Sequence, residues 1–384
     1  MTRRVGKLAG IGVDQMGTIA DRLQNERLLR LENLDTDLVP PEGVIETTKK
    51  EVELDSANSY LPFVGSAELR QAATGLVSRL SGVSYNCNDS TIICAGGLNG
   101  ILNALLALLD DGDEVVMTDP IYIGLINRVR LAGGVPVYVP YQIDNGIWKL
   151  DRDQLDKAIT PKTKVFLMMS PSMPTGAVFS RRDWEVICAA CCRADAWLLY
   201  DSAMERILYD RLEYFHPASF SGMSERTITV GSVSKEYRMI GWRVGWIVAP
   251  PKIINDIGLV TISNVVCPVG IAQKAATIAL RTPDSDIASV TEEWQRRRDK
   301  ILEELHAFSV VKPQGGWSML MDASPFGLTG AEFSRRLLEK SKVVATAMAG
   351  WGGERSDHFI RLVFSNEPVD RLKGLHDRIE AAIE

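Results

Sequence analysis

Lys235 stands among small residues, in a pattern that suits covalent chemistry on a carbonyl compound. It ends the stretch 231–235, which reads GSVSK and follows the β-branched run Thr227–Val230, and Arg243 comes eight positions later. An amine in such a place can form an imine beside a bound anion. The alternative, a solvated lysine with a structural arginine, fits less well because the flanking residues are apolar and rich in glycine.

A pair of glycines provides a place for that anion. Gly96 and Gly97 follow the strand-like run Thr91–Ala95, and Leu98 then opens a helical pattern. Glycine lets backbone amides approach an anion, and a helix N-terminus carries partial positive charge. Because a glycine pair before a helix is also a common structural turn, this motif gains meaning only together with others.

Tyr122 and Asp201 each follow another strand-like run. Tyr122 comes after Glu114–Thr118 and offers an aromatic face to a planar ligand, although it fits an ordinary surface position equally well. Asp201 follows Trp197–Tyr200 directly, where a carboxylate can hold a buried cation or cap the next helix. Because each of them follows a predicted strand, both residues are candidates for the same site.

The segments that carry these residues are predicted to form one sheet. From about residue 90 to residue 250, short apolar runs alternate with helical patterns such as Asn99–Leu109. This alternation predicts an α/β fold with a mostly parallel, doubly wound sheet, in which ligands bind at the carboxyl ends of the strands. The predicted strands are Thr91–Ala95, Glu114–Thr118, Val135–Val139, Val165–Met169, Trp197–Tyr200, Thr227–Val230 and Val244–Val248, of which the last can run antiparallel.

One small molecule needs all four kinds of group at that edge. Pyridoxal 5′-phosphate has a phosphate for the glycine pair, a ring for Tyr122, a pyridine nitrogen for Asp201 and an aldehyde for Lys235. The strand-end residues therefore predict this cofactor.

The rest of the chain is predicted to form an N-terminal arm and a smaller α/β domain. We expect an N-terminal arm at 1–45, which belongs to the small domain, a large cofactor domain at 46–285 and a small C-terminal domain at 286–384. Predicted helices are Thr18–Arg30, Ile271–Leu280, Val290–Phe308, Ala331–Lys340 and Val369–Ile383, and predicted strands are Val310–Pro313, Ser318–Asp322 and His358–Phe364.

The composition argues against several other classes of protein. The net charge of −6, spread over 384 residues, predicts no nucleic-acid partner, and no apolar run reaches the roughly 18–20 residues that cross a bilayer. No cleavable signal is recognised, so we expect the cytoplasm. Six cysteines and four histidines predict no disulfide scaffold, no metal site and no histidine base. Cys188 and Cys191 lie in the helical pattern Trp184–Arg193 and predict a buried helix.

Nearly the whole chain resembles the fold-type I pyridoxal-phosphate enzymes, specifically the class I/II aminotransferases. The residues that carry the resemblance are the pattern S-x-S-K…G-W-R-x-G over Ser232–Gly245 and its order relative to Asp201, Pro174-Thr175-Gly176 and the glycine pair. The resemblance implies the aspartate aminotransferase-like fold, with a large sheet domain and a smaller α/β domain. It also implies a homodimer.

The same resemblance implies roles for individual residues. Lys235 would be the Schiff-base lysine, which also moves a proton between the substrate Cα and the cofactor. Asp201 would pair with the pyridine nitrogen. The remaining cofactor contacts would come from Gly96, Gly97, Leu98, Ser232 and Arg243 at the phosphate, from Tyr122 over the ring, and from Tyr60 of the neighbouring subunit. Arg361 would hold the substrate α-carboxylate, and its planar guanidinium group suits this task better than the ammonium group of a lysine.

Three positions depart from the family pattern. Met173 stands where the family has an asparagine, and Met204 stands where the family has a tyrosine. In the family, this asparagine and this tyrosine donate to the cofactor phenolic oxygen. Leu34 stands where many members have a glycine beside the substrate. Another side chain or a water can supply the lost bonds, and this alternative stays open.

The leading functional hypothesis is an aminotransferase that moves an α-amino group between an L-amino acid and a 2-oxo acid. The alternative keeps the cofactor but performs elimination, replacement, cyclisation or oxidation of an amino acid. A catalytically silent binding protein is a third hypothesis, which the intact lysine and arginines disfavour. Asn33, Leu34 and Trp317 are the predicted walls of the substrate pocket, and an apolar or aromatic substrate would suit them.

Overall fold

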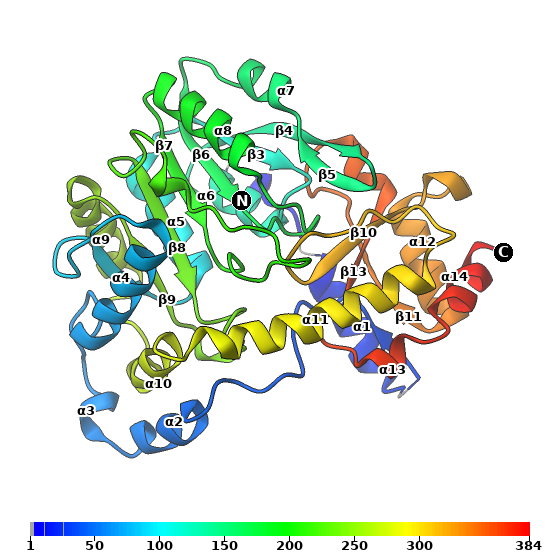
Figure 1. Cartoon of the computed structure of the whole chain (residues 1–384), viewed down its shortest axis with the longest axis horizontal. Coiled ribbons are helices and arrows are strands. Elements are labelled where there is room, and N and C mark those ends of the chain that lie inside the picture. Colours follow the sequence, from blue (N-terminus) through cyan, green and yellow to red (C-terminus); the bar gives the residue numbers. More distant parts are fainter. Residues whose placement is uncertain (1–3, 11, 26) are drawn as a thin grey trace.

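A mixed eight-stranded sheet forms the centre of the larger part of the molecule (Figure 1). The computed structural model describes residues 4–10, 12–25 and 27–384. The strand order is β2-β9-β8-β7-β6-β3-β4-β5, and the four pairings from β8 through β7, β6 and β3 to β4 are parallel. Its strands are β2 (Thr91–Cys94), β3 (Glu114–Asp119), β4 (Val135–Asp144), β5 (Ile147–Leu150), β6 (Thr163–Met169), β7 (Trp197–Asp201), β8 (Thr227–Ser232) and β9 (Gly245–Val248).

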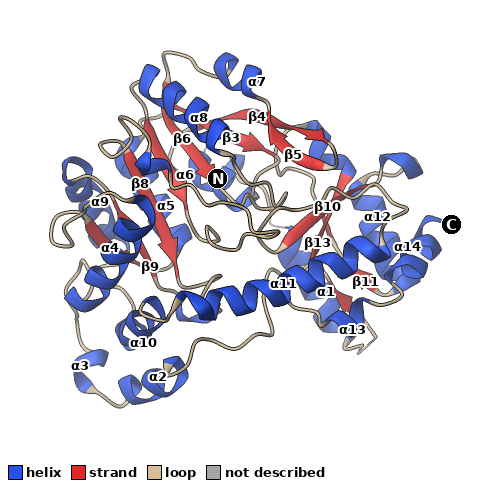
Figure 2. Cartoon of the chain, viewed as in Figure 1, coloured by secondary structure: helices blue, strands red, loops and turns tan. Residues whose placement is uncertain are grey.

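Helices cover both faces of this sheet, as the uninterrupted apolar strands require (Figure 2). In β6, Val165 and Leu167 pack into one core cluster, while Phe166 and Met168 pack into another on the opposite face. Around the sheet lie α2 (Val44–Val52), α3 (Asp55–Asn58), α4 (Ala67–Ser81), α5 (Gly97–Leu108), α6 (Ile123–Leu131), α7 (Arg152–Lys157), α8 (Arg181–Arg193), α9 (Pro251–Asn264) and α10 (Gly270–Leu280). The doubly wound α/β fold is therefore confirmed.

The N-terminal segment and the C-terminal third build two smaller sheets. One has the order β10-β13-β12, and the other pairs β1 with β11 in parallel. The long helix α11 runs beside both regions in Figure 1. The elements are α1 (Gly12–Leu23), β1 (Leu29–Arg30), α11 (Asp284–Glu304), β10 (Ser318–Asp322), α12 (Gly330–Arg336), β11 (Val343–Val344), β12 (Thr346–Ala347), β13 (Phe359–Val363), α13 (Val369–Leu372) and α14 (Leu375–Ile383).

The seven strands predicted in the central sheet are all confirmed, and β9 is antiparallel to both of its neighbours. The helix containing Cys188 and Cys191 is confirmed as well, because both thiols are buried in α8. The antiparallel partner β5 extends the sheet beyond the predicted strands, because β4 continues past Val139 and turns back at Asn145 and Gly146.

Several boundaries outside the large sheet were wrong. The helix predicted at Thr18–Arg30 ends at Leu23, because Leu29 and Arg30 pair with β11 instead. The segment Val310–Pro313 forms a single bridge between Val310 and Met321 rather than a strand. In these cases partners distant in the sequence decide the local structure.

Three further helices differ in extent from their predictions. The predicted Val290–Phe308 helix begins earlier, at Asp284, and ends at Glu304. The predicted Ala331–Lys340 helix is α-helical only to Arg336 and then continues as a π-helix. The predicted Val369–Ile383 helix is divided at Gly374, whose φ of 75° a helix interior does not allow. Within the described ranges, no helix combines the length and apolar character that crossing a bilayer requires.

Candidate active site

A cavity of about 210 Å³ lies at the carboxyl ends of the parallel strands. It collects residues from β7, β8, the first turn of α5 and the N-terminal segment. Its lining residues are Leu34, Gly97, Leu98, Tyr122, Met169, Met173, Asp201, Ala203, Met204, Ser232, Ser234, Lys235, Ile240 and Arg243. Most of the predicted cofactor residues therefore meet in one place.

An anion cradle forms where α5 begins. Gly96 has φ 87° and ψ 160°, a backbone conformation that glycine adopts almost alone. A Cβ on Gly96 would lie 2.5 Å from Nη2 of Arg243, and a Cβ on Gly97 would lie 3.3 Å from Cβ of Ser232. The two glycines thus let the helix N-terminus, the arginine and the serine approach one another closely.

The Lys235 side chain reaches into this cavity from the loop after β8. Its Nζ donates to the carbonyl oxygen of Leu34 at 2.8 Å and lies 4.8 Å from the ring centre of Trp317. Burial lowers the pKa of Lys235 to about 7, while Asp35 acts in the opposite direction. A substantial neutral fraction at neutral pH is the state in which an amine acts as nucleophile or base.

Asp201 ends β7 and is only 6% exposed. Burial raises its pKa to about 6, against the hydrogen bond that it accepts from the Ala203 amide at 3.1 Å and the charge of Arg128. A carboxylate held in this way favours a cationic partner that enters the cavity.

Tyr122 comes directly before α6, and its ring lies over the first turn of that helix. A Cβ on Gly124 would lie 2.4 Å from Cε1 of Tyr122, so the ring occupies the space that a side chain would fill there. Trp351 packs on Tyr122 with ring centres 5.5 Å apart. The backbone amide of Ile121 also donates to the Trp351 carbonyl at 2.9 Å, which ties the two loops together.

Arg361 lies in β13 and is completely buried. Its Nη2 donates to the Glu32 carbonyl at 2.6 Å, its Nη1 lies 3.6 Å from the Met173 sulfur, and its guanidinium lies 5.1 Å from the Trp351 ring centre. Its Nε has no hydrogen-bond partner. Burial lowers its pKa to about 10, so it remains a cation at neutral pH. A buried arginine with an unpaired Nε–H suits a carboxylate ligand.

Gly96 and Arg361 are not among the lining residues, although Gly96 precedes Gly97 and Arg361 contacts Met173. Three further predicted site residues also lie outside the lining. Tyr60 is 84% exposed and does not line the cavity. Asn33 also lies outside the lining, although its neighbour Leu34 forms part of it. Trp317 is completely buried beneath Lys235 and stacks edge-on with Trp294, so it supports the lysine rather than forming a wall of the cavity.

Both unusual methionines are part of the lining. Met173 and Met204 are 4% and 2% exposed and give the cavity a thioether surface together with Met169. Thioethers are weak acceptors and donate no hydrogen bond. On this side the cavity is therefore poor in donors.

Sequence reasoning missed two residues that support the site. Arg128 donates from Nε to the Leu98 carbonyl and from Nη1 to the Gly124 carbonyl, both at 2.7 Å, and so connects the anion cradle to the turn below Tyr122. Trp351 reaches Arg361 and Tyr122 from a loop of the small sheet region. Arg128 gave no strand-end signal because it lies within α6, and Trp351 lies ten residues before Arg361 in an irregular segment.

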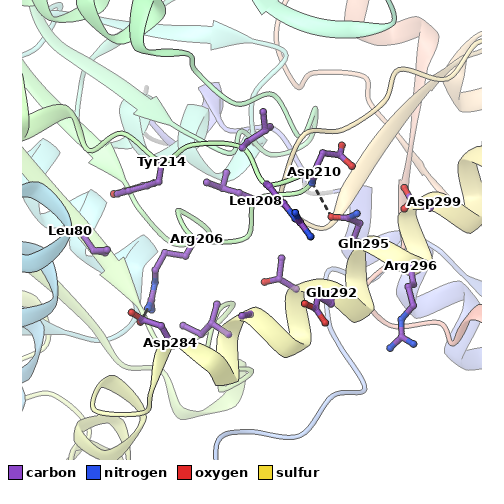
Figure 3. A pocket seen from close by; sticks show the side chains of 15 residues that line it. Leu80, Arg206, Leu208, Asp210, Tyr214, Asp284, Glu292, Gln295, Arg296 and Asp299 are labelled. Atoms are coloured by element: carbon purple, nitrogen blue, oxygen red, sulfur yellow. Dashed lines mark hydrogen bonds and ion pairs between the residues drawn. The ribbon is translucent and has the colours of Figure 1, made fainter.

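A larger groove of about 980 Å³ lies between α11 and the loop after β7 (Figure 3). Its charged side chains are mostly in ion pairs: Arg206 with Asp284 at 3.1 Å and Asp210 with Arg298 at 2.8 Å. The amide of Asp210 also donates to Gln295, as Figure 3 shows. The groove contains no lysine. Helix α14 carries a further group of polar side chains whose spacing would allow them to bind a metal ion: His376, Asp377 and Glu380.

The residues of the small cavity fit pyridoxal 5′-phosphate. Gly96 and Gly97 leave space that a Cβ would fill, Arg243 faces that space, and Asp201 and Lys235 border the same cavity. Among the described residues, no carboxylate forms an ion pair with Lys235, Arg243 or Arg361. Arg361 is completely buried and Arg243 is exposed at the cavity, and because neither has an anionic partner in the described part of the chain, this region favours a ligand that brings a phosphate and a carboxylate.

Comparison with known proteins gives the same answer. The family model described as "Aminotransferase class I and II" matches residues 30–379. An aspartate aminotransferase of Pyrococcus abyssi is 31% identical over 353 residues, which cover 91% of this chain and 90% of that protein. An aromatic-amino-acid aminotransferase 2 of Thermococcus litoralis is 30% identical over 91% of this chain and 90% of that protein.

A solved structure has the same fold over the full length. The N-succinyldiaminopimelate aminotransferase of Mycobacterium tuberculosis superposes with a TM-score of 0.93 at 28% identity, covering 100% of both chains. The family match, the relatives and the fold agree with the geometry of the cavity. The chain belongs to the class I and II aminotransferase family, whose members transfer amino groups with pyridoxal 5′-phosphate.

Proposed function

We propose that the 210 Å³ cavity is where this protein performs transamination between an L-amino acid and a 2-oxo acid. The observation that carries the proposal is the position of Lys235, whose amine borders the same cavity as the anion cradle and Asp201. When bound, pyridoxal 5′-phosphate supplies an aldehyde that condenses with amines and a ring that accepts the electron pair released at the substrate Cα.

Lys235 would bind the cofactor covalently and then move a proton at the substrate Cα. Its pKa near 7 supports both tasks, because the neutral amine attacks a carbonyl and a base near the operating pH transfers protons efficiently. The bond to the Leu34 carbonyl would hold Nζ at the cavity. Asp201 would keep the pyridine nitrogen protonated, since its carboxylate is mostly ionised above pH 6.

The arginines would place the two anionic ends of the ligands. Arg243, Ser232 and the amides of Gly97 and Leu98 would bind the cofactor phosphate, each charge-assisted bond contributing about 1.5–3 kcal/mol. Arg361 would bind the substrate α-carboxylate with its guanidinium, whose Nε–H has no partner in the part of the protein that the structure describes. With these two groups fixed, the Cα is held near Lys235, and this positioning accelerates proton transfer.

We propose a substrate with an apolar or aromatic side chain. Leu34, Ile240 and the three methionines make much of the cavity apolar. The relatives named for aspartate and for aromatic amino acids show that the overall similarity leaves the side chain open. A panel of phenylalanine, leucine, methionine, aspartate and glutamate, each with 2-oxoglutarate and with pyruvate, would rank the donors by kcat/KM.

The same panel tests the reaction type. Liquid chromatography with mass spectrometry should find one 2-oxo acid formed per new amino acid, without release of ammonia or uptake of oxygen. Ammonia or oxygen consumption in proportion to substrate loss would contradict transamination and would support the elimination or oxidation alternative.

We further propose a homodimer in which Tyr60 completes the neighbour's phosphate site. Tyr60 and Phe63 are exposed, and so are Val266 and Val269, which lie close by because the Cys267 thiol contacts the Leu61 carbonyl. Such a group of exposed apolar side chains favours a protein interface. Mixing Lys235→Ala with Tyr60→Ala subunits should restore activity if sites are shared, since one mixed site contains neither substitution.

We also propose a division into domains and a cellular location. The division into 1–45, 46–285 and 286–384 is supported by the pairing of β1 with β11, which joins the N-terminal segment to the smaller region. A cytoplasmic location is supported by the six cysteines, all of which are free thiols.

A further inference from the structure

Glu32 is a carboxylate in an unusual position. It follows β1, its side chain is completely buried, and its Oε2 has no hydrogen-bond partner. The other oxygen, Oε1, accepts from Arg30 at 2.6 Å. A buried carboxylate with one unpaired oxygen is costly, so its position calls for a compensating interaction.

A second cation that acts on Glu32, besides Arg30, belongs to the proposed carboxylate site. Nη2 of Arg361 donates to the backbone carbonyl of Glu32 at 2.6 Å, so the two residues are in direct contact. Arg361 is itself completely buried and has an unpaired Nε. The negative charge of Glu32 acts on Arg361 electrostatically, but no ion pair within 4 Å joins the two side chains.

Arg30 has a second acidic partner, which separates its role from that of Arg361. Its Nη1 bonds to Asp21 at 2.6 Å, and its side chain is 29% exposed. Arg30 therefore keeps an acidic partner and contact with water even without Glu32, whereas Arg361 is completely buried and, among the described residues, has only uncharged hydrogen-bond partners. Glu32 therefore pairs directly with Arg30 and, together with Tyr122, also acts electrostatically on the buried Arg361.

We propose that Glu32 is the internal counter-charge of Arg361 and thereby sets how tightly this site binds a substrate carboxylate. The inference rests on the proposed role of Arg361 and deepens it. Before binding, the negative charge of Glu32 partly offsets the buried cation. A substrate carboxylate must then bind an arginine whose charge is already partly offset, so Glu32 lowers the affinity of the site for the substrate carboxylate.

The test measures binding of 3-phenylpropionate, a monocarboxylate without an amino or oxo group, to the holoenzyme by calorimetry. Glu32→Gln keeps the shape of the side chain and removes the charge. It should bind the probe roughly 5- to 30-fold more tightly, the range expected for one charge in a partly screened buried site with an effective dielectric constant of about 20 or more. In turnover, KM should fall in the same ratio while kcat does not rise.

Glu367 provides a matched control. It is 5% exposed, accepts from the Arg30 amide at 2.7 Å and pairs with Arg371, but it is not among the charges that act on Arg361. Glu367→Gln should leave the affinity within about twofold. Glu32→Asp keeps the charge and should stay close to the parent. The neutral amide of the probe should bind the parent and Glu32→Gln equally, because it lacks the charge on which the effect depends.

A gain in affinity distinguishes the proposal from structural damage, which weakens binding. If Glu32→Gln does not fold, Glu32→Met replaces it, with the same expected tightening. Unchanged or weaker binding in the folded variant, with Arg361→Leu still weakening the probe at least tenfold, overturns the inference and leaves the proposed function intact. If Arg361→Leu does not weaken the probe, the proposed carboxylate site itself is wrong.

Discussion

The small cavity and the large groove differ in how their charges are satisfied. The groove beside α11 has more than four times the volume of the cavity, about 980 Å³ against 210 Å³, yet most of its charged side chains already have partners within the protein. In the cavity, Lys235 and Arg243 have no carboxylate partner among the described residues, and the same holds for the neighbouring Arg361. Charged side chains without a partner in the protein therefore mark a site for an anionic ligand better than volume does.

We expect Lys235 to matter far more for catalysis than a lysine beside the groove. Lys235→Ala should lower kcat/KM by at least about 10⁴-fold, because both covalent binding and proton transfer are lost. Lys312, which pairs with Asp210 at 3.0 Å near the groove, is the matched control. Steady-state rates of Lys312→Ala should stay within about twofold of the parent, and a large loss there would mean that the groove takes part in the reaction.

The second largest effect concerns the arginines. Arg361→Leu should reduce kcat/KM by about 10²- to 10³-fold, since a buried charge-assisted contact to a carboxylate contributes about 3–4 kcal/mol. The loss should be mainly in KM. Arg296→Leu removes an exposed arginine that lines the groove and pairs with Glu293. Kinetics at saturating acceptor should show little change for this variant, and equal losses in the two would argue against a special role for Arg361.

A methyl group added at Gly96 should weaken cofactor binding, with a smaller effect than the loss of Lys235 or Arg361. Gly96→Ala would place a Cβ 2.5 Å from the Arg243 guanidinium, and the arginine would have to move. We expect the dissociation constant of pyridoxal 5′-phosphate to rise about 10- to 100-fold, through the displaced arginine and the strained backbone. Gly82 has φ 69°, and a Cβ added there would meet no other atom within 4 Å. Gly82→Ala should therefore lower the melting temperature without changing cofactor affinity by more than about twofold.

The smallest expected effect is a pH dependence. Burial lowers the pKa of Lys235 to about 7, so its amine is mostly charged below this pH and mostly neutral above it. Because the neutral amine attacks the cofactor aldehyde, the rate constant for cofactor binding to the apoprotein should rise roughly threefold between pH 6.5 and pH 7.5. Stopped-flow absorbance would follow this rate. A rate that falls over the same interval would contradict the assignment.

The central sheet and most of the cavity could be predicted because both follow from local patterns. Apolar runs such as Val165–Met169 are typical of strands covered on both faces, and parallel strands bring the residues that follow them to one edge. Lys235, Asp201 and Gly97, which line the cavity, were predicted in this way. Tyr60 remains a prediction, because its proposed role depends on a second subunit.

Residues brought in by distant tertiary contacts could not be predicted. Glu32 stands beside Arg361 because the N-terminal segment continues along the small sheet region, where the Val363 amide donates to the Leu31 carbonyl. The sequence around Glu32 contains no sign of that neighbour. The predicted helix Thr18–Arg30 failed for the same reason, since the pairing of Leu29 and Arg30 with β11 outweighs their local helical pattern.

Binding of the cofactor in the small cavity through Lys235 can be tested directly. Treating the holoenzyme with borohydride makes a lysine–cofactor linkage permanent, and peptide mapping by mass spectrometry then locates it. We predict one cofactor mass per chain, on the peptide that contains Lys235. Attachment to Lys312 or to any other lysine, with the Lys235 peptide unmodified, would contradict this central claim.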